Sequence, residues 1–130
     1  MRTKTGFIYV LVVAALCMGG ASLLAHHSWT AQYDPTKPLE VKGMVSKFEW
    51  TNPHARFYVD ARSTGGDVTT WNFELASPNI LLRNGWTRNT LKVGDQVSVT
   101  GFIARSNPKM AIAGEVVDGT GKKLFASSTN

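Results

Sequence analysis

The sequence predicts an all-β domain with one short helix, and three observations support that class. The chain has 130 residues, which is enough for one ordinary domain. Apolar residues make up 43% and charged residues 18%, the balance of a folded chain rather than a disordered one. Twelve glycines and five prolines suit short strands joined by turns better than a bundle of helices.

Residues 1–25 are predicted to be a signal peptide for export. Arg2 and Lys4 form a basic start, residues 6–18 are uncharged and apolar, and small residues follow. An apolar stretch of about 13 residues is too short to span a bilayer, which needs roughly 20. We therefore expect cleavage, a periplasmic or secreted protein and no stable membrane span afterwards; an uncleaved anchor is the alternative. Cys17 is the single cysteine and leaves with the signal, so no disulfide is expected.

Two cleavage positions compete, one before Ser22 and one before His26. We favour the cut before His26, which makes a histidine the first residue of the mature chain. The formal net charge of +5 falls when Arg2 and Lys4 are removed with the signal. Because the remaining basic balance is mild and export separates the protein from the cytosol, nucleic acid is not an expected partner.

Residues 26–38 are predicted to form an extended arm ahead of the folded body. Pro35 and Pro38 each disfavour helix at the residue before them. The barrel itself is expected over residues 39–125, and residues 126–130 are expected to form a flexible tail.

Five strands are predicted from the alternation of apolar and polar residues and from the turn signals between them. They cover residues 39–50, 55–62, 68–76, 96–104 and 110–117, and a short segment follows at 123–125. In the first strand Val41 and Val45 share one face, and Gly43 between them permits a bend or a bulge. In the third strand Phe73 and Leu75 lie on the apolar face.

A short helix is predicted between the third and fourth strands. Ser77 can accept hydrogen bonds from unpaired backbone amides as the N-cap, and Pro78 is tolerated at the first helical position. Gly85 can end the helix because glycine adopts a left-handed conformation without steric cost. Ile80 and Leu81 are expected to face the core.

Three strands, a short helix and two strands, with a long bent first strand, predict a small OB-fold-like Greek-key barrel of five strands. Closing the sheet leaves few exposed edges, which suits a small domain without cysteine. An open β-sandwich is the alternative architecture.

Several motifs occur along the mature chain: His26-His27-Ser28, Tyr33-Asp34, Trp50-Thr51-Asn52-Pro53-His54-Ala55, Ser77-Pro78-Asn79, Arg83-Asn84-Gly85-Trp86-Thr87-Arg88 and Val93-Gly94-Asp95-Gln96-Val97. Together they resemble the motifs of a domain-of-unknown-function family of short exported bacterial proteins. The resemblance implies a periplasmic or secreted location in Gram-negative bacteria and supplies no activity. This chain departs from the family pattern at Trp29, where phenylalanine is usual, and at Arg56, where an apolar residue is usual; neither departure removes a candidate polar site.

Three histidines of the mature chain, His26, His27 and His54, form a candidate metal site. After a cut before His26, its α-amine and imidazole can chelate one ion, and His54 or His27 can add a nitrogen. A planar array of nitrogens suits Cu(II), and zinc is the other candidate. The first strand separates the arm from His54, so a shared site requires that the arm folds back along the barrel. The alternative is that His26 and His27 form a flexible start and that His54 only packs or hydrogen-bonds in its turn.

A second candidate site is a cluster of polar and aromatic residues near the first turn and the helix, where OB-folds commonly bind ligands. Its members are Trp50, Asn52, His54, Glu74, Asn79, Arg83, Trp86 and Arg88. Glu74 points away from the apolar face of its strand, and we expect it to pair with Arg83 or Arg88. Such a cluster could bind a small anionic ligand, a sugar or a peptide. The alternative is structural, with Arg83 capping carbonyls and with Trp50 and Trp86 closing the ends of the barrel.

Catalysis is not predicted. The mature chain has no cysteine nucleophile, and the sequence has no Gly-x-Ser-x-Gly motif, no His-Glu-x-x-His motif and no glycine-rich phosphate loop. The sequence therefore predicts an exported, non-catalytic binding module. It is expected to bind a periplasmic protein or small ligand through the Trp50–His54 turn and the 77–88 helix region. A copper- or zinc-binding protein is the alternative, and no other cofactor is expected.

Overall fold

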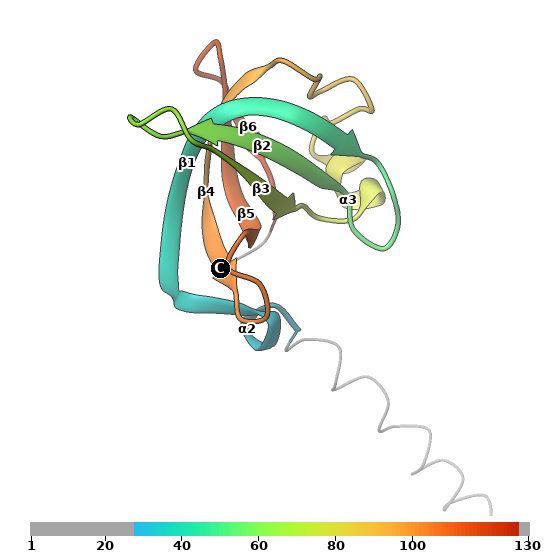
Figure 1. The fold of residues 1–130 in the computed structure, drawn as a ribbon. Helices are drawn as coiled ribbons and strands as arrows, with labels where there is room; N and C mark the ends of the chain where they lie inside the picture. The colour runs from blue at the N-terminus through green and yellow to red at the C-terminus, as the bar shows by residue number, and fades with distance from the viewer. Residues whose placement is uncertain (1–27, 128–130) are drawn as a thin grey trace, which may run out of the picture.

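The computed structural model describes residues 28–127, which form one sheet and two short helices (Figure 1). The predictions for residues 1–27 and 128–130 lie outside the described residues. They include the signal peptide, its cleavage position, His26, His27 and the end of the tail. Within the part that is described, no helix is both long and apolar enough to cross a membrane.

The elements of residues 28–127 follow the predicted order of three strands, a helix and two strands. Along the chain they are α2 (Ser28–Gln32), β1 (Tyr33–Glu49), β2 (Arg56–Arg62), β3 (Val68–Glu74), α3 (Pro78–Arg83), β4 (Gln96–Ala104), β5 (Met110–Asp118) and β6 (Lys123–Phe125).

The sheet has the strand order β3-β2-β1-β4-β5-β6, and neighbours in this order are antiparallel. An additional parallel pairing of β3 with β5 joins distant parts of the sheet, so that five strands form a ring. Figure 1 shows the long β1 curving around this ring, with α2 beside its start and α3 near its end. This barrel-like ring confirms the predicted all-β, OB-fold-like architecture.

The long strand β1 pairs with two different strands of the ring. Its first half pairs with β4 and its second half pairs with β2. The two pairings overlap at Met44. At the neighbouring Gly43 a Cβ would overlap the backbone carbonyl of Asp60, so only glycine allows this close approach. A β-bulge follows between Val45 and Lys47. The missing side chain of Gly43 therefore allows close contact between strands, and the bulge lies two residues farther along the strand.

Local sequence sets both ends of α3. The side chain of Ser77 accepts a hydrogen bond from the amide of Ile80. Gly85 has a φ of +84°, and the amide of Trp86 donates to the carbonyl of Leu81 over 3.0 Å, which closes the C-terminal end. Leu81 is buried as predicted, but Ile80 is 43% exposed, so the prediction that Ile80 faces the core is wrong. Adjacent residues on a helix point about 100° apart, and this short helix turns only one of the two inward.

The main core lies inside the ring and is built of apolar side chains. Its large, fully buried members are Val45, Phe57, Val59, Phe73, Leu75, Leu81, Trp86, Val99 and Val116. The rings of Phe57 and Phe73 stack across neighbouring strands with centroids 5.3 Å apart. Alternation along β2 and β3 places both rings inside, as the sequence predicts.

The arm differs from the expected extended form at residues 28–32, which form α2. Prolines at 35 and 38 restrict only the residues directly before them, so they leave this earlier segment able to form a helix. The rest of the arm belongs to β1, where Tyr33 lies opposite Ala104 of β4.

A second apolar cluster forms where the arm packs against the outside of the ring. Its members, which we call the arm cluster, are Trp29, Tyr33, Phe102, Ala104, Met110 and Ile112. The rings of Trp29 and Phe102 have centroids 5.5 Å apart. Arg105 adds polar contacts, because its Nε donates to the carbonyl of Thr30 over 3.1 Å and its guanidinium lies 3.4 Å from the carboxylate of Asp34.

The tail begins later than the sequence predicts. Ala126 is fully buried, and its carbonyl accepts a hydrogen bond of 2.9 Å from the amide of Ala76. This residue therefore completes the core just after β6 rather than belonging to a flexible end.

Candidate functional site

Glu74, the last residue of β3, is a charged residue in a buried position. Alternation along β3 turns Phe73 inward and Glu74 to the outer face, as the sequence predicts. An outward carboxylate would ordinarily meet water, but Glu74 is only 4% exposed, and the arm residue Tyr33 lies against it. Burying a charge is costly unless the charge is paired and hydrogen-bonded. The partners of Glu74 therefore define the site.

Three side chains bind this carboxylate, one from the arm and two from the segment at the start of β2, and together with Glu74 they form what we call the Glu74 site. The hydroxyl of Tyr33 donates to Oε2 over 2.8 Å, and the guanidinium of Arg56 pairs with the same oxygen. Nδ1 of His54 lies 2.6 Å from the other oxygen, Oε1. Arg56 is in reach because antiparallel pairing of β2 with β3 places it directly opposite Glu74.

His54 lies in the turn between β1 and β2, and its side chain is 48% exposed. A carboxylate can only accept a hydrogen bond, so the contact with Glu74 places a proton on Nδ1. In the neutral imidazole Nε2 then carries the lone pair, which can bind a metal ion or accept a proton. A histidine whose other ring nitrogen is held by a carboxylate is the usual arrangement of a metal-ligating imidazole.

Tyr33 is kept as a hydrogen-bond donor by its surroundings. Burial, followed by the hydrogen bond to Glu74, raises the pKa of the Tyr33 hydroxyl well above its ordinary value of 10.0. The nearby Arg56 acts in the opposite direction and does not outweigh these two causes. The phenol therefore remains protonated near neutral pH and donates to the carboxylate.

The contact between Tyr33 and Glu74 also brings the arm to the turn that carries His54. A site shared by His54 and the N-terminal histidines was expected to need an arm that folds back along the barrel; in the described residues, Tyr33 of the arm reaches the carboxylate that also contacts His54. The helix α2 begins at Ser28, directly after His27 in the sequence. The two N-terminal histidines are therefore attached to the segment that the Glu74 site anchors.

The other predicted aromatic residues pack against the core. Trp86 is 2% exposed, and its ring centroid lies 6.2 Å from that of Phe48. Trp50 is partly buried and contacts the same ring edge-on, at 5.9 Å between centroids. Asn52 is exposed in the turn and precedes a cis peptide bond to Pro53. The aromatic part of the predicted cluster thus supports the fold rather than lining the Glu74 site.

The prediction that Glu74 pairs with Arg83 or Arg88 is wrong. Arg56 takes that position because the register of β2 and β3 sets it across from the carboxylate. Asn79 and Arg83 are exposed on α3, and Arg88 is exposed in the loop that follows. The structure therefore does not bring these three residues to Glu74.

Sequence reasoning missed two members of the site, Tyr33 and Arg56. A signal for Arg56 was present, because a hairpin loop at residues 63–67 fixes the register and counting back from it pairs Arg56 with Glu74. Nothing local marks Tyr33, since its contact with Glu74 spans 41 residues and depends on the path of the arm.

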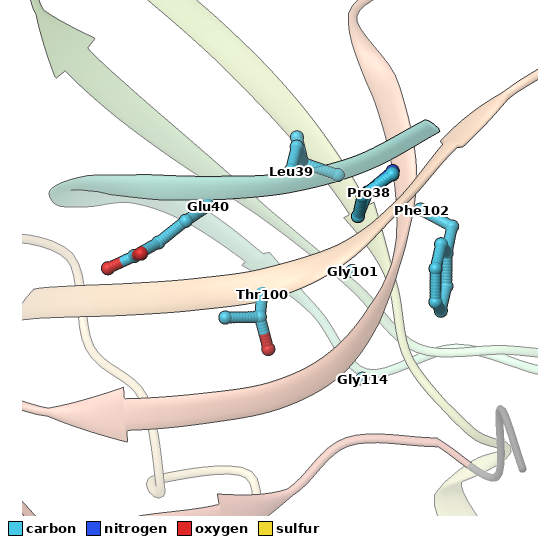
Figure 2. A pocket seen from close by; sticks show the side chains of 7 residues that line it. All are labelled: Pro38, Leu39, Glu40, Thr100, Gly101, Phe102 and Gly114. Atoms are coloured by element: carbon cyan, nitrogen blue, oxygen red, sulfur yellow. The ribbon is translucent and has the colours of Figure 1, made fainter. Parts of the chain in front are cut away.

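A groove of about 600 Å³ lies away from the Glu74 site, along β1, β4 and β5 (Figure 2). Its lining residues are Pro38, Leu39, Glu40, Thr100, Gly101, Phe102 and Gly114. Figure 2 shows Glu40 and Thr100 on one side of it and Phe102 on the other. None of the predicted site residues lines this groove, so it is a separate surface feature. A smaller cavity of about 240 Å³ lies beside Tyr33.

The described residues alone do not complete a metal site. Within residues 28–127, no group of three His, Cys, Asp or Glu side chains is placed to hold a metal ion. The Glu74 site supplies one imidazole nitrogen, from His54. Further ligands would have to come from residues such as His26 and His27, which lie outside the described residues.

The family of unknown function DUF6152 matches residues 13–113. The chain belongs to this family, which confirms the resemblance to a domain-of-unknown-function family. Comparison with curated proteins and with solved structures found no match.

Proposed function

We propose that this protein is an exported, non-catalytic binding protein that holds a copper or zinc ion at His54. The observation that carries the proposal is the buried carboxylate of Glu74, which lies 2.6 Å from Nδ1 of His54 and leaves Nε2 as the ligand atom. A carboxylate in this position fixes both the tautomer and the orientation of the imidazole.

A purely structural role accounts less well for the third partner of the carboxylate. Tyr33 and Arg56 both bind Oε2 and together provide a donor and a counter-charge. His54 is half-exposed, so water could satisfy its ring nitrogens if it had no other task. Its short bond to the remaining oxygen instead holds the ring in one orientation, which is what a metal ligand requires.

The remaining ligands are proposed to come from the start of the mature chain. If cleavage falls before His26, the α-amine and imidazole of that residue provide two nitrogens, and His27 can provide another. Cu(II) is the favoured ion because amine and imidazole nitrogens suit its planar geometry. Zn(II) accepts imidazole ligands in a tetrahedral arrangement and is the second choice.

Calorimetric titration of the exported, processed protein with Cu(II) and Zn(II) tests the proposal. We expect a Kd below about 10 µM, and we expect His54→Ala and His26→Ala each to weaken binding at least about tenfold. Asn52→Ala is the matched control, because Asn52 is an exposed residue of the same turn and is not a proposed ligand. An unchanged affinity in His54→Ala, or binding of the wild type weaker than this limit, would disprove the proposal.

N-terminal sequencing of the exported protein adds an independent check. A first residue at His26 provides the amine and imidazole together. A first residue at Ser22 removes this chelate and favours the second candidate function.

That second candidate is docking of a periplasmic protein or small ligand on the Trp50–His54 turn and the 77–88 region. The observation that favours it is a pair of large apolar side chains on α3, Ile80 at 43% exposed and Leu82 at 54% exposed. Arg83 is exposed on the same helix. Exposed apolar side chains next to a basic one offer a partner both apolar and charged groups to contact.

Rescue of a deletion strain separates the two candidates. Under the second one, Arg83→Ala and the double variant Ile80→Ser/Leu82→Ser lose rescue while they keep the wild-type affinity for Cu(II). If both variants restore every phenotype of the deletion, this surface is not the functional one.

A further inference from the structure

We infer that a hollow on the outer face of the sheet is a ligand site, and that it binds a free α-amino acid with an apolar side chain. The hollow has a volume of about 380 Å³. The side chains around it are those of Lys42, Met44, Asp60, Arg62, Val68 and Gln96. No residue of the Glu74 site lines this hollow, so the inference does not rest on the proposed metal site.

The register of the sheet brings these residues together from four strands. Met44 of β1 lies opposite Asp60 of β2 on one side and opposite Gln96 of β4 on the other. Arg62 lies opposite Val68, next to the loop that joins β2 and β3. Asp60 and Arg62 share the outer face of β2, because the buried residues of that strand alternate with the outward ones. The hollow therefore lies at the hairpin end of the sheet, opposite the end near α3 (Figure 1).

The carboxylate of Asp60 is held in one orientation by one of its oxygens. Its Oδ1 accepts a hydrogen bond from the hydroxyl of Thr70 over 2.6 Å and another from the hydroxyl of Ser46 over 3.2 Å. In the part of the chain that the structure describes, no group donates a hydrogen bond to the second oxygen, Oδ2. A link between strands alone needs no charge, since an amide oxygen accepts the same two hydrogen bonds. The fixed, charged oxygen is instead the acceptor that the ammonium group of a ligand requires.

Arg62 supplies the opposite charge at a spacing that suits an amino acid. It uses Nη1 to donate to the carbonyl of Gly66 over 2.9 Å, and its guanidinium has further donors for a ligand carboxylate. Residues two apart on a strand have Cα atoms about 7 Å apart, which an ammonium and a carboxylate on one carbon can bridge with one hydrogen bond each. A ligand with a single charge would face a like charge in the hollow, so a zwitterion fits it better.

Two exposed apolar side chains flank these charges and favour an apolar ligand side chain. Met44 is 47% exposed and Val68 is 51% exposed, although both are large and apolar. A ligand side chain that covers them removes apolar surface from water and so adds to the affinity.

Calorimetric titration of the exported, processed protein with L-leucine tests this inference. We expect a Kd below about 1 mM, which a ligand of about nine non-hydrogen atoms reaches with well under the maximum binding free energy per atom. Leucinamide, which lacks the carboxylate, and 4-methylpentanoate, which lacks the ammonium, should each bind at least about tenfold more weakly. Asp60→Asn keeps an oxygen for both hydroxyls and removes the charge, so it should weaken L-leucine about tenfold. Asp34→Asn is the matched control, because Asp34 also accepts two hydrogen bonds on one oxygen but lies in the arm.

Amide NMR spectra of the ¹⁵N-labelled protein locate the bound ligand. L-leucine should shift the signals of residues 42–44, 60–62, 68 and 96. Shifts confined to the groove along β1, β4 and β5, or a Kd above the stated limit, would overturn the inference. If Asp60→Asn binds L-leucine as tightly as the wild type, Asp60 only links strands and the inference is equally wrong. Should Asp60→Asn not fold, Arg62→Gln decides the outcome, with an expected loss of at least about fivefold.

Discussion

The protein buries side chains in two regions by different physical means. Inside the ring, Phe57, Val59 and Phe73 are fully buried and apolar, so their burial needs shape but no particular partner. Against the arm, Tyr33 and Glu74 are buried almost as completely, at 1% and 4% exposed, but each is polar. Their burial depends on specific hydrogen bonds. This region therefore determines which side chains come into contact, whereas the apolar core contributes mainly through tight packing.

The strand β3 carries both regions on adjacent residues. Phe73 points into the core and Glu74 points to the arm, because successive side chains alternate across a strand. The stable core thereby holds the backbone of Glu74 in place, and the carboxylate can orient His54 from a rigid element. A site built in this way is more precise than one carried by loops alone.

The largest expected loss of unfolding free energy comes from a substitution in the apolar core. Phe73→Ala should lower the free energy of unfolding by about 3 to 5 kcal/mol, because it removes a fully buried ring and leaves a cavity. Trp29→Ala, which removes a partly buried ring of the arm cluster, should cost about 1 kcal/mol. Urea unfolding of both variants measures the difference. Equal losses would mean that the arm cluster contributes to stability as the core does.

Removing the buried carboxylate should have the next largest effect. Glu74→Leu leaves Arg56 without its counter-charge and Tyr33 without its acceptor. We expect a loss of about 2 kcal/mol, less than for a fully buried pair, because the side chain of Arg56 is 28% exposed and water can solvate it.

The double variant Glu74→Leu/Arg56→Leu sharpens this result. Replacing both charges with apolar side chains should restore part of the stability lost in Glu74→Leu, since no charge is then left unpaired. Urea unfolding of the single and double variants gives the comparison. A double variant less stable than Glu74→Leu would contradict this expectation, because Arg56 would then stabilise the fold without its counter-charge, through contacts such as the one with Asn72.

The two regions also differ in how well sequence could predict them. The core followed from local patterns: alternation placed Phe73 inside, and Ser77 and Gly85 marked the ends of α3. These signals work because each is satisfied within a few residues of chain. The barrel-like architecture, though not the strand order, followed from the sequence of elements and the glycine within the long first strand.

The site was predicted in part, and its partners were not. His54 and Glu74 were both candidates, but the contact that joins them depends on the register of β2 and β3, and the contact of Glu74 with Tyr33 depends on the path of the arm. Trp86 was a candidate because an aromatic residue in a core and one in a ligand site look alike in a sequence; only burial separates them. Long-range contacts of this kind leave no periodic signal.

Tyr33 gives the smallest expected effect, and it depends on pH. Its pKa in the folded protein is raised above 10.0 by burial and by the bond to Glu74, whereas the phenol of the unfolded chain ionises near that value. The stability that it contributes is therefore complete below pH 10 and falls as the pH rises further, because only the unfolded chain then releases the proton. The slope for one such group reaches about 1.4 kcal/mol per pH unit.

Urea unfolding of wild type and Tyr33→Phe between pH 9 and pH 11 isolates this contribution. The difference in unfolding free energy between the two proteins should be constant near pH 9 and should shrink above pH 10, since the variant has no phenol at this position to ionise. An apolar core residue cannot produce such a slope, so the measurement separates the two modes of burial directly. Parallel curves for the two proteins would mean that the Tyr33 hydroxyl is not held against Glu74 in solution, and the arm would then be anchored by the contacts of Trp29 and Arg105 alone.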